Sequence, residues 1–402
     1  MRTPSWRHLT GAAAALALLA GAGSTGGPGG PGGPGGTAEP PEAAGENRLY
    51  VPPASAGALK QADALRRAGR AGDATAIARM AGTPQAVWFS GTATGRVAND
   101  VRRVVRDAAR EGALPVLVLY NIPGRDCSQY SAGGAADTAA YTAWIDEVAK
   151  GIGTRRAAVV LEPDSLALLP SDCGRDDAGG TLTAARYTEL NHAVDALSGN
   201  PGTTVYLDAG HSGWHSVGTI VPRLLRAGAA RARGFHLNVA NHRGDAELAR
   251  YGRLVSGCLG YARDGGDPAD CPGQRTDTAE ADRWLAANVT TGPAGQPHFV
   301  TDTSRNGRGP WTPPAGKYTD AQEWCNPPGR GLGRRPATEG TDGPLIDAHL
   351  WIKIPGESDG PCLRGTEGPQ DPERGTVAPD AGGWFAEQAL ELVRHANPPL
   401  AQ

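Results

Sequence analysis

Short apolar runs recur along this chain, and each of them ends in polar residues. The run 116–120, for example, stops at Asn121 and passes into a loop rich in proline and glycine. Short runs of β-branched and apolar residues bounded by such turn signals are typical of buried strands. The pattern predicts seven strands, at residues 86–89, 116–120, 157–162, 203–208, 234–239, 298–302 and 347–354.

Stretches of helical composition alternate with these strands. After a leading segment at 49–53, they cover residues 56–81, 99–111, 137–150, 183–198, 215–228 and 383–396. Strands that alternate with helices favour a parallel sheet with right-handed crossovers. We therefore predict an α/β fold with a parallel sheet or barrel, whose active site lies at the carboxyl ends of its strands.

Polar side chains collect where the predicted strands end. Asp126 lies in the loop after the second strand, and Asp164 directly follows the third. Because the carboxyl ends of parallel strands share one face, both acids are expected in one cleft. A single aspartate at such a place often only caps a helix, but the repetition over successive strands is harder to explain in that way. The other residues of this kind are Tyr120, Asp208, Asn241, Asp302, Lys353 and Glu357.

Length and charge narrow the function classes. The 402 residues suffice for one large domain or two ordinary ones. The net charge of −3 provides no basic surface for nucleic acid or for an anionic membrane, so neither is an expected partner.

The first residues have the pattern of an export signal. Arg2, Arg7 and His8 precede an apolar run at 11–23 that is too short to span a bilayer. We predict a signal peptide at 1–24, a secreted, extracellular protein, a flexible Gly/Pro-rich linker at 25–46 and a catalytic domain at 47–402.

Export permits disulfides between the six cysteines. The local pairing, one of several possible connectivities, joins Cys127 to Cys173, Cys258 to Cys271 and Cys325 to Cys362. No C-x-x-C spacing is present, which argues against a structural zinc site. No cofactor is expected.

Seven motifs, in this order, resemble glycoside hydrolase family six, secreted cellulases that cut β-1,4-glucan with inversion. They are NIPGRDCSQYSAGG, LEPDSL, YLDAGHSGW, NVANH, DTSRNGRG, EWCNPPGRGLG and WIKIPGESDG. The resemblance covers residues 47–400 and implies a distorted, incomplete barrel of about seven parallel strands.

The resemblance also implies catalytic roles. Asp164 corresponds to the general acid, and Asp126 to a companion that raises the pKa of the acid and stabilises positive charge at the anomeric carbon. Asp359 corresponds to the base, although a water chain at Ser131 is the alternative path for the proton. Such an acid needs a raised pKa, and a neighbouring carboxylate supplies it by charge repulsion.

Other positions resemble sugar contacts of the family. These are Tyr120, His211, Trp214, Asn241, Trp324, Lys353 and Glu357. For Tyr50, stacking at a distal glucose subsite and packing of the N-terminal segment are equally open. Asp208 and Asp302 either orient the acid or cap a loop, and Trp144 is expected in the core.

The favoured hypothesis is a monomeric inverting β-1,4-glucanase that cuts cellulose internally. Release of cellobiose from chain ends is the alternative if the loops at 127–137 and 362–384 roof the cleft. A silent glucan-binding protein is the alternative of another class, and filled acid positions argue against it. A metal-dependent deacetylase would need clustered ligands, whereas the histidines at 192, 211, 242, 298 and 349 have no tight metal spacing.

Overall fold

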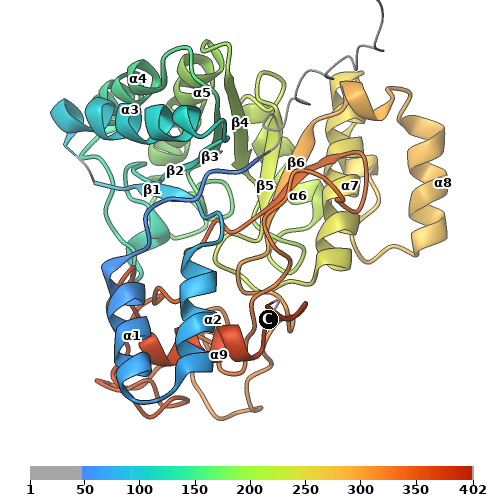
Figure 1. The fold of residues 1–402 in the computed structure, drawn as a ribbon. Coiled ribbons are helices and arrows are strands. Elements are labelled where there is room, and N and C mark those ends of the chain that lie inside the picture. Colours follow the sequence, from blue (N-terminus) through green and yellow to red (C-terminus); the bar gives the residue numbers. More distant parts are fainter. Residues whose placement is uncertain (1–47, 92, 401–402) are drawn as a thin grey trace, which may run out of the picture. The chain divides into compact units, whose positions relative to one another are not determined.

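Seven strands form one parallel sheet in which each strand pairs with the preceding one in the chain (Figure 1). The computed structural model describes residues 48–400 except Thr92, so the predicted signal peptide (1–24) and linker (25–46) lie outside the described residues. The strands are β1 (Val87–Phe89), β2 (Val116–Leu119), β3 (Ala157–Leu161), β4 (Thr203–Asp208), β5 (Gly234–Leu237), β6 (His298–Asp302) and β7 (Ile346–Leu350).

Most of the helices follow a strand and cover the outside of the sheet, whereas the first two precede all the strands. The α-helices are α1 (Ala56–Arg67), α2 (Ala71–Ala81), α3 (Thr94–Arg110), α4 (Thr138–Ile152), α5 (Thr181–Ser198), α6 (Val217–Arg226), α7 (Asp245–Arg263), α8 (Thr278–Asn288) and α9 (Ala386–Arg394). Three short 3₁₀ turns lie at Asp126–Ser128, Pro268–Asp270 and Pro293–Gly295.

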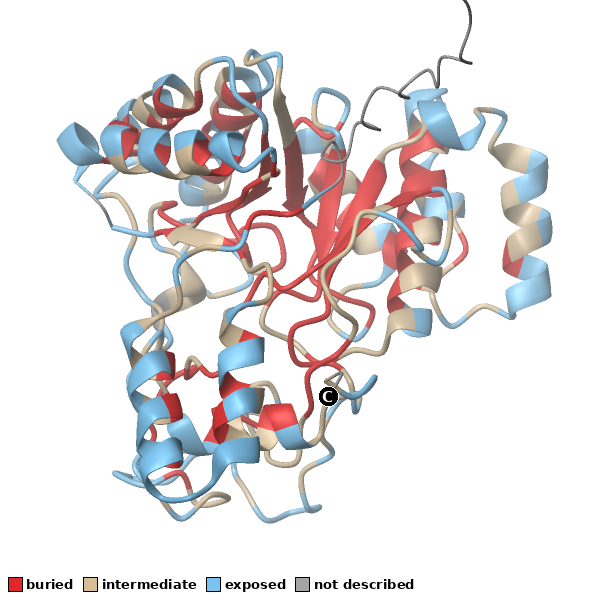
Figure 2. Ribbon diagram, in the orientation of Figure 1, coloured by how far each residue is buried: buried red, intermediate tan, exposed pale blue. Residues whose placement is uncertain are grey.

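Alternate side chains of each strand enter two different cores, because successive residues of a strand point to opposite faces. In β2, Leu117 and Leu119 join a large core that contains buried residues of α3 to α7. Val116 and Val118 point the other way, into a smaller core enclosed by the curled sheet. Figure 2 shows the strands as the buried centre of the molecule. This arrangement confirms the predicted distorted barrel.

The barrel remains open between its first and last strands. No ladder joins β1 to β7 among the described residues, but the N–H of Ala86 donates to the carbonyl oxygen of Trp351 (3.0 Å). The indole N–H of Trp88 donates to the carbonyl oxygen of Ile352 (2.8 Å). Helices α1, α2 and α9 pack together beside this seam and share a small apolar core with Trp351 (Figure 1).

The predicted helices differ from those of the structure in three respects. The single helix expected at 56–81 is two helices, because Gly69 adopts φ +73° between them and ends the first. Helices α7 and α8 were not predicted. Gly252, Gly257 and Gly260 weaken the helical pattern of α7, and Gly252 is needed because the Phe299 ring of β6 packs against its Cα.

The three disulfides are those of the local pairing, Cys127–Cys173, Cys258–Cys271 and Cys325–Cys362. The first connects the loops that follow β2 and β3, and the third connects those that follow β6 and β7. In the described part of the chain, no helix has both the length and the apolar character needed to cross a membrane.

Candidate active site

Asp164 lies in the loop after β3 and is half-buried. The hydroxyl of Tyr120, at the end of β2, donates a 3.3 Å hydrogen bond to its Oδ2. Burial raises the pKa of Asp164 well above its usual range, and the negative charges of Asp208 and Asp126 raise it further. This carboxyl group therefore keeps its proton to a higher pH than an ordinary aspartate does.

Asp126 lies in the neighbouring loop, after β2. Burial raises its pKa to about 6 and the charge of Asp359 adds to this effect, while the N–H of Ser131 and the charge of Arg125 lower it. The Ser131 N–H donates to Asp126 Oδ2 at 2.6 Å, which places Ser131 directly beside this carboxylate. Asp126 and Asp164 thus form an electrostatically coupled pair at adjacent strand ends.

The backbone is strained where these acids are attached. Asp126, Glu162 and Asp164 adopt φ values of +57°, +47° and +68°. Residues other than glycine rarely adopt this left-handed backbone conformation. Such residues cost about 1–3 kcal/mol each and cluster at functional sites. Gly134 (φ +101°) lets the Asp126 loop return to β2, because a Cβ there would collide with the carbonyl oxygen of Ile122.

Asp359, in the loop after β7, has a different environment. Arg305 Nη1 lies 2.8 Å and Lys353 Nζ 3.5 Å from its carboxylate, and the N–H of Asn326 donates to it at 2.9 Å. Burial alone would raise the pKa of Asp359, but Arg305, Lys353 and the N–H of Asn326 lower it to about 2. Asp359 is therefore ionised at any pH at which the protein is expected to work.

His211 and Trp214 lie together in the loop after β4, with their ring centres 5.5 Å apart. Burial lowers the pKa of His211 to about 3, and its Nδ1 accepts the N–H of Gly213 (3.2 Å). The imidazole is therefore neutral. Asn241, after β5, is half-buried and hydrogen-bonds to the same histidine.

Trp324, in the long segment after β6, is half-buried, and its ring centre lies 6.2 Å from that of Tyr130 in the Asp126 loop. The Tyr130 hydroxyl accepts the N–H of Leu363 (3.0 Å) and donates to Gln322 Oε1 (3.2 Å). The loop after β2 therefore contacts the segments that follow β6 and β7. Glu357, also after β7, is half-buried, and burial raises its pKa.

The family model described as Glycosyl hydrolases family 6 matches residues 44–396. The chain belongs to this family. Endoglucanase A of Cellulomonas fimi is 36% identical over 81% of the chain, but the match spans only 57% of the length of that relative. A probable 1,4-beta-D-glucan cellobiohydrolase C of Aspergillus fumigatus is 31% identical over 81% of the chain and 71% of its own length.

A solved structure of a family 6 protein has the same fold. It is the endoglucanase Cel6 from Mycobacterium tuberculosis in complex with methyl-cellobiosyl-4-deoxy-4-thio-beta-D-cellobioside. The two chains are 36% identical and superpose with a TM-score of 0.67, over 88% of the present chain and 98% of the other.

Three strand-end carboxylates of this family 6 chain accept backbone N–H groups of neighbouring loops. Glu162 accepts the N–H groups of Asn121 and Ile122 (2.8 and 2.9 Å), and Asp208 accepts those of Leu166 and Ala167 (3.0 and 2.9 Å). Asp302 likewise accepts N–H groups from the loops after β5 and β7. Asp208 and Asp302 thus bind loop backbone, as the capping alternative predicts, and the charge of Asp208 also raises the pKa of Asp164. Glu162 was not singled out from the sequence, and burial raises its pKa to about 8.

Tyr50 lies away from these acids. It packs against Ala108 and Ala113 beside the amino end of β2, where its N–H donates to the carbonyl oxygen of Leu114 (2.9 Å). Of the two alternatives for Tyr50, the structure favours packing. Trp144 is 1% exposed and lies in the large core, as predicted.

The sequence predicts no role for Arg305, although this residue lies within the motif DTSRNGRG. Its side chain is fully buried and holds Asp359 from the end of β6. An arginine after a strand predicts nothing by itself, because only the fold brings it to a carboxylate 54 residues away.

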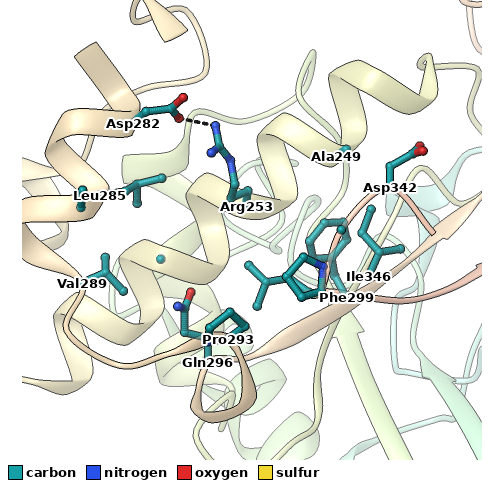
Figure 3. A pocket seen from close by; sticks show the side chains of 15 residues that line it. Ala249, Arg253, Asp282, Leu285, Val289, Pro293, Gln296, Phe299, Asp342 and Ile346 are labelled. Atoms are coloured by element: carbon teal, nitrogen blue, oxygen red, sulfur yellow. Dashed lines mark hydrogen bonds and ion pairs between the residues drawn. The ribbon is translucent and has the colours of Figure 1, made fainter. Parts of the chain in front are cut away.

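A separate cavity of about 350 Å³ lies at the opposite end of the sheet, between α7, α8 and the amino ends of β6 and β7. Figure 3 shows the ion pair between Arg253 and Asp282 beside its apolar lining. None of the predicted catalytic residues lines it. Within residues 48–400, Thr92 apart, no three His, Cys, Asp or Glu side chains converge as metal ligands would.

Proposed function

We propose that this family 6 protein is a secreted inverting β-1,4-glucanase that cuts internal bonds of cellulose by general acid and base catalysis. The observation that carries the proposal is the contrast between Asp164, whose pKa is raised, and Asp359, whose pKa is lowered to about 2, at the same end of one barrel. Hydrolysis of a glycosidic bond requires one protonated and one ionised carboxyl group at the same pH.

Asp164 is the proposed general acid. Its proton passes to the departing glycosidic oxygen, and the raised pKa keeps that proton in place until the bond breaks. Asp126 assists in two ways. Its negative charge raises the pKa of Asp164, and it stabilises the positive charge that develops at the anomeric carbon.

The proton of the attacking water has two proposed destinations. Asp359 is ionised and available, but its ion pairs with Arg305 and Lys353 lower its affinity for a proton. A water chain at Ser131 leads instead toward Asp126, whose pKa of about 6 makes it the stronger base. In either case inversion requires room for a water, with acid and base about 6.5–9.5 Å apart.

The proposed sugar contacts surround this centre. Trp214 and Trp324 offer partly exposed indole faces to the apolar faces of glucose rings. His211 and Asn241 offer neutral hydrogen-bonding groups, and Glu357 with Tyr120, Ser131 and Lys353 completes the set. We further propose export through the signal at 1–24 and action outside the cell as a monomer on a glucan chain, without nucleic acid, membrane or cofactor.

Release of cellobiose from chain ends is the second candidate function, and the contact made by Tyr130 favours it. Internal cutting needs an open cleft, whereas the hydrogen bond from Leu363 to Tyr130 joins the loops after β2 and β7. Loops that stay joined would admit a glucan chain only from its end.

The deciding experiment is proton NMR of the reducing ends formed while the purified protein digests cellohexaose, with the products sized in parallel. New α-anomers are expected, together with several product lengths. Cellobiose as the only early product would replace internal cutting by chain-end release. New β-anomers would contradict inversion, and binding without cleavage would leave a glucan-binding protein. Glucan cleavage that survives chelation would remove the metal-dependent deacetylase alternative.

A further inference from the structure

Two connections join the loop that carries Asp126 to the loop that carries Asp164. The disulfide between Cys127 and Cys173 joins the loops beyond the two acids. The second connection is the guanidinium of Arg186, which projects from α5 beneath both loops and is 3% exposed.

The guanidinium of Arg186 donates to both loops at once. Its Nη2 donates to the carbonyl oxygen of Pro123 (3.0 Å), three residues before Asp126. Its Nη1 donates to the carbonyl oxygen of Ser165 (2.8 Å), directly after Asp164, and more weakly to that of Leu168 (3.4 Å). The planar fork of an arginine fixes two such acceptors at one spacing, which the single charged nitrogen of a lysine cannot do.

The surroundings hold Arg186 itself in place. Glu189, one turn further along α5, lies 3.9 Å from its Nε and accepts the hydroxyl of Thr138 at the start of α4 (2.7 Å). Glu162 holds the N–H groups of Asn121 and Ile122, directly before Pro123. The first residues of the Asp126 loop are thus held both through their N–H groups, by Glu162, and through a carbonyl oxygen, by Arg186.

We propose that Arg186 is a positioning residue that sets the spacing between Asp126 and Asp164. This inference rests on the proposed function, in which the charge of Asp126 keeps the proton on Asp164. It adds a residue that touches neither substrate nor reacting atoms and acts through the two loops. If the spacing relaxes, the repulsion between the two carboxyl groups weakens and Asp164 loses its proton at a lower pH.

Arg186→Lys tests this role, with Arg223→Lys as the matched control. Arg223 on α6 donates to the carbonyl oxygen of Leu166 (2.8 Å) and pairs with Asp172 (2.6 Å), so it holds the Asp164 loop alone. We expect Arg186→Lys to lower kcat/KM on cellohexaose about tenfold and to move the high-pH limb of the profile to lower pH. Arg223→Lys should keep that limb where the unsubstituted protein has it.

Two further measurements separate positioning from simple stability. In an Asp126→Asn background, Arg186→Lys should shift the limb less than it does in the unsubstituted protein, because Asp126 no longer repels Asp164 and only the charge of Asp208 still does. Should Arg186→Lys fail to fold, Glu189→Gln, which frees the guanidinium from one side, should give a smaller shift in the same direction. Equal losses in both lysine variants with unchanged pH profiles would overturn the proposal.

The proposal can be tested even if the protein cleaves no glucan. Titration of the Asp164 carboxyl group, followed by NMR against an Asp164→Asn reference, reports its proton affinity in the free protein. A lower midpoint in Arg186→Lys than in Arg223→Lys supports positioning by Arg186. Equal midpoints contradict it, whereas absent hydrolysis by the unsubstituted protein contradicts only the glucanase assignment.

Discussion

The two halves of the candidate site contain the same kind of group in opposite electrostatic states. On the β2–β3 side, burial and neighbouring carboxylates raise the pKa values of Asp126 and Asp164. On the β6–β7 side, Asp359 is even less exposed, yet two cations and an N–H donor lower its pKa to about 2.

The difference teaches that burial alone does not decide the role of a carboxyl group here. Burial opposes the charge of all three aspartates, so the neighbouring cations make the distinction. Arg305 and Lys353 face Asp359, whereas the charges that act most strongly on Asp164 are those of Asp208 and Asp126. One side of the site therefore retains a proton and the other retains a negative charge.

Removal of the proton donor should have the largest effect. Asp164→Asn is expected to lower kcat on unactivated glucan by about a thousandfold, because an amide cannot donate the proton and general acids contribute about 10²–10⁴. The high-pH limb of the profile should disappear as well, since it reports loss of the Asp164 proton as pH rises through its raised pKa. Steady-state rates on cellohexaose from pH 4 to pH 10 measure both.

Two controls accompany this variant. The dinitrophenolate group of a dinitrophenyl cellobioside departs without being protonated, so hydrolysis of this substrate should largely survive in Asp164→Asn. Asp347→Asn removes another half-buried carboxylate, which lies on β7 and pairs with Arg233, and this variant should keep its kcat on cellohexaose. Full activity of Asp164→Asn on unactivated glucan would remove Asp164 from its proposed role.

Much of the fold could be predicted from the sequence, because its signals are local. Each strand is a short apolar run, and the polar residues behind it mark the carboxyl end. Helix α7 could not be predicted in this way, because Gly252 and Gly257 permit close packing against Phe299 and Leu285 at the expense of helix propensity. Packing against other parts of the fold, and not the local sequence pattern, therefore accounts for the glycines of α7.

The site could be predicted only in part, for a similar reason. Motifs marked Asp126, Asp164 and Asp359, but the sequence does not show which charges surround them. Arg305 and Arg186 lie 54 and 21 residues away from the groups that they bind, at Asp359 and Ser165 respectively. Such partners become visible only when the barrel brings its strand ends together.

Removal of the Arg305 cation should raise the pKa of Asp359 and so reduce its difference from the pKa of Asp164. Arg305→Gln is expected to destabilise the protein by about 3–5 kcal/mol near pH 7, because the buried carboxylate loses its main partner. The lowered pKa of Asp359 stabilises the fold above the ordinary value of 3.8, and this contribution is lost as pH falls toward 2. The loss caused by the variant should therefore shrink below pH 3.8, which urea unfolding at pH 7 and at pH 2.5 would measure.

The same variant distinguishes the two proposed bases. If Asp359 accepts the proton, its higher pKa in Arg305→Gln should move the low-pH limb of kcat/KM to higher pH. An unmoved limb would favour the path by Ser131 and Asp126. Arg394→Gln is the control, because its exposed ion pair with Asp73 (2.7 Å) should contribute less than about 1 kcal/mol.

The smallest expected effect concerns substrate binding on the Asp359 side. Trp324 is half-buried and its ring centre lies 6.2 Å from that of Tyr130, so part of the indole is exposed where we propose that it contacts a glucose ring. Trp324→Ala should raise KM for cellohexaose about tenfold, or about 1.4 kcal/mol, and change the melting temperature little. Trp144→Phe, a substitution in the core, should lower the melting temperature and leave KM for cellohexaose unchanged. An unchanged KM with a lowered melting temperature in Trp324→Ala would make Trp324 a packing residue, and the Asp359 side would then contribute charge without a sugar platform.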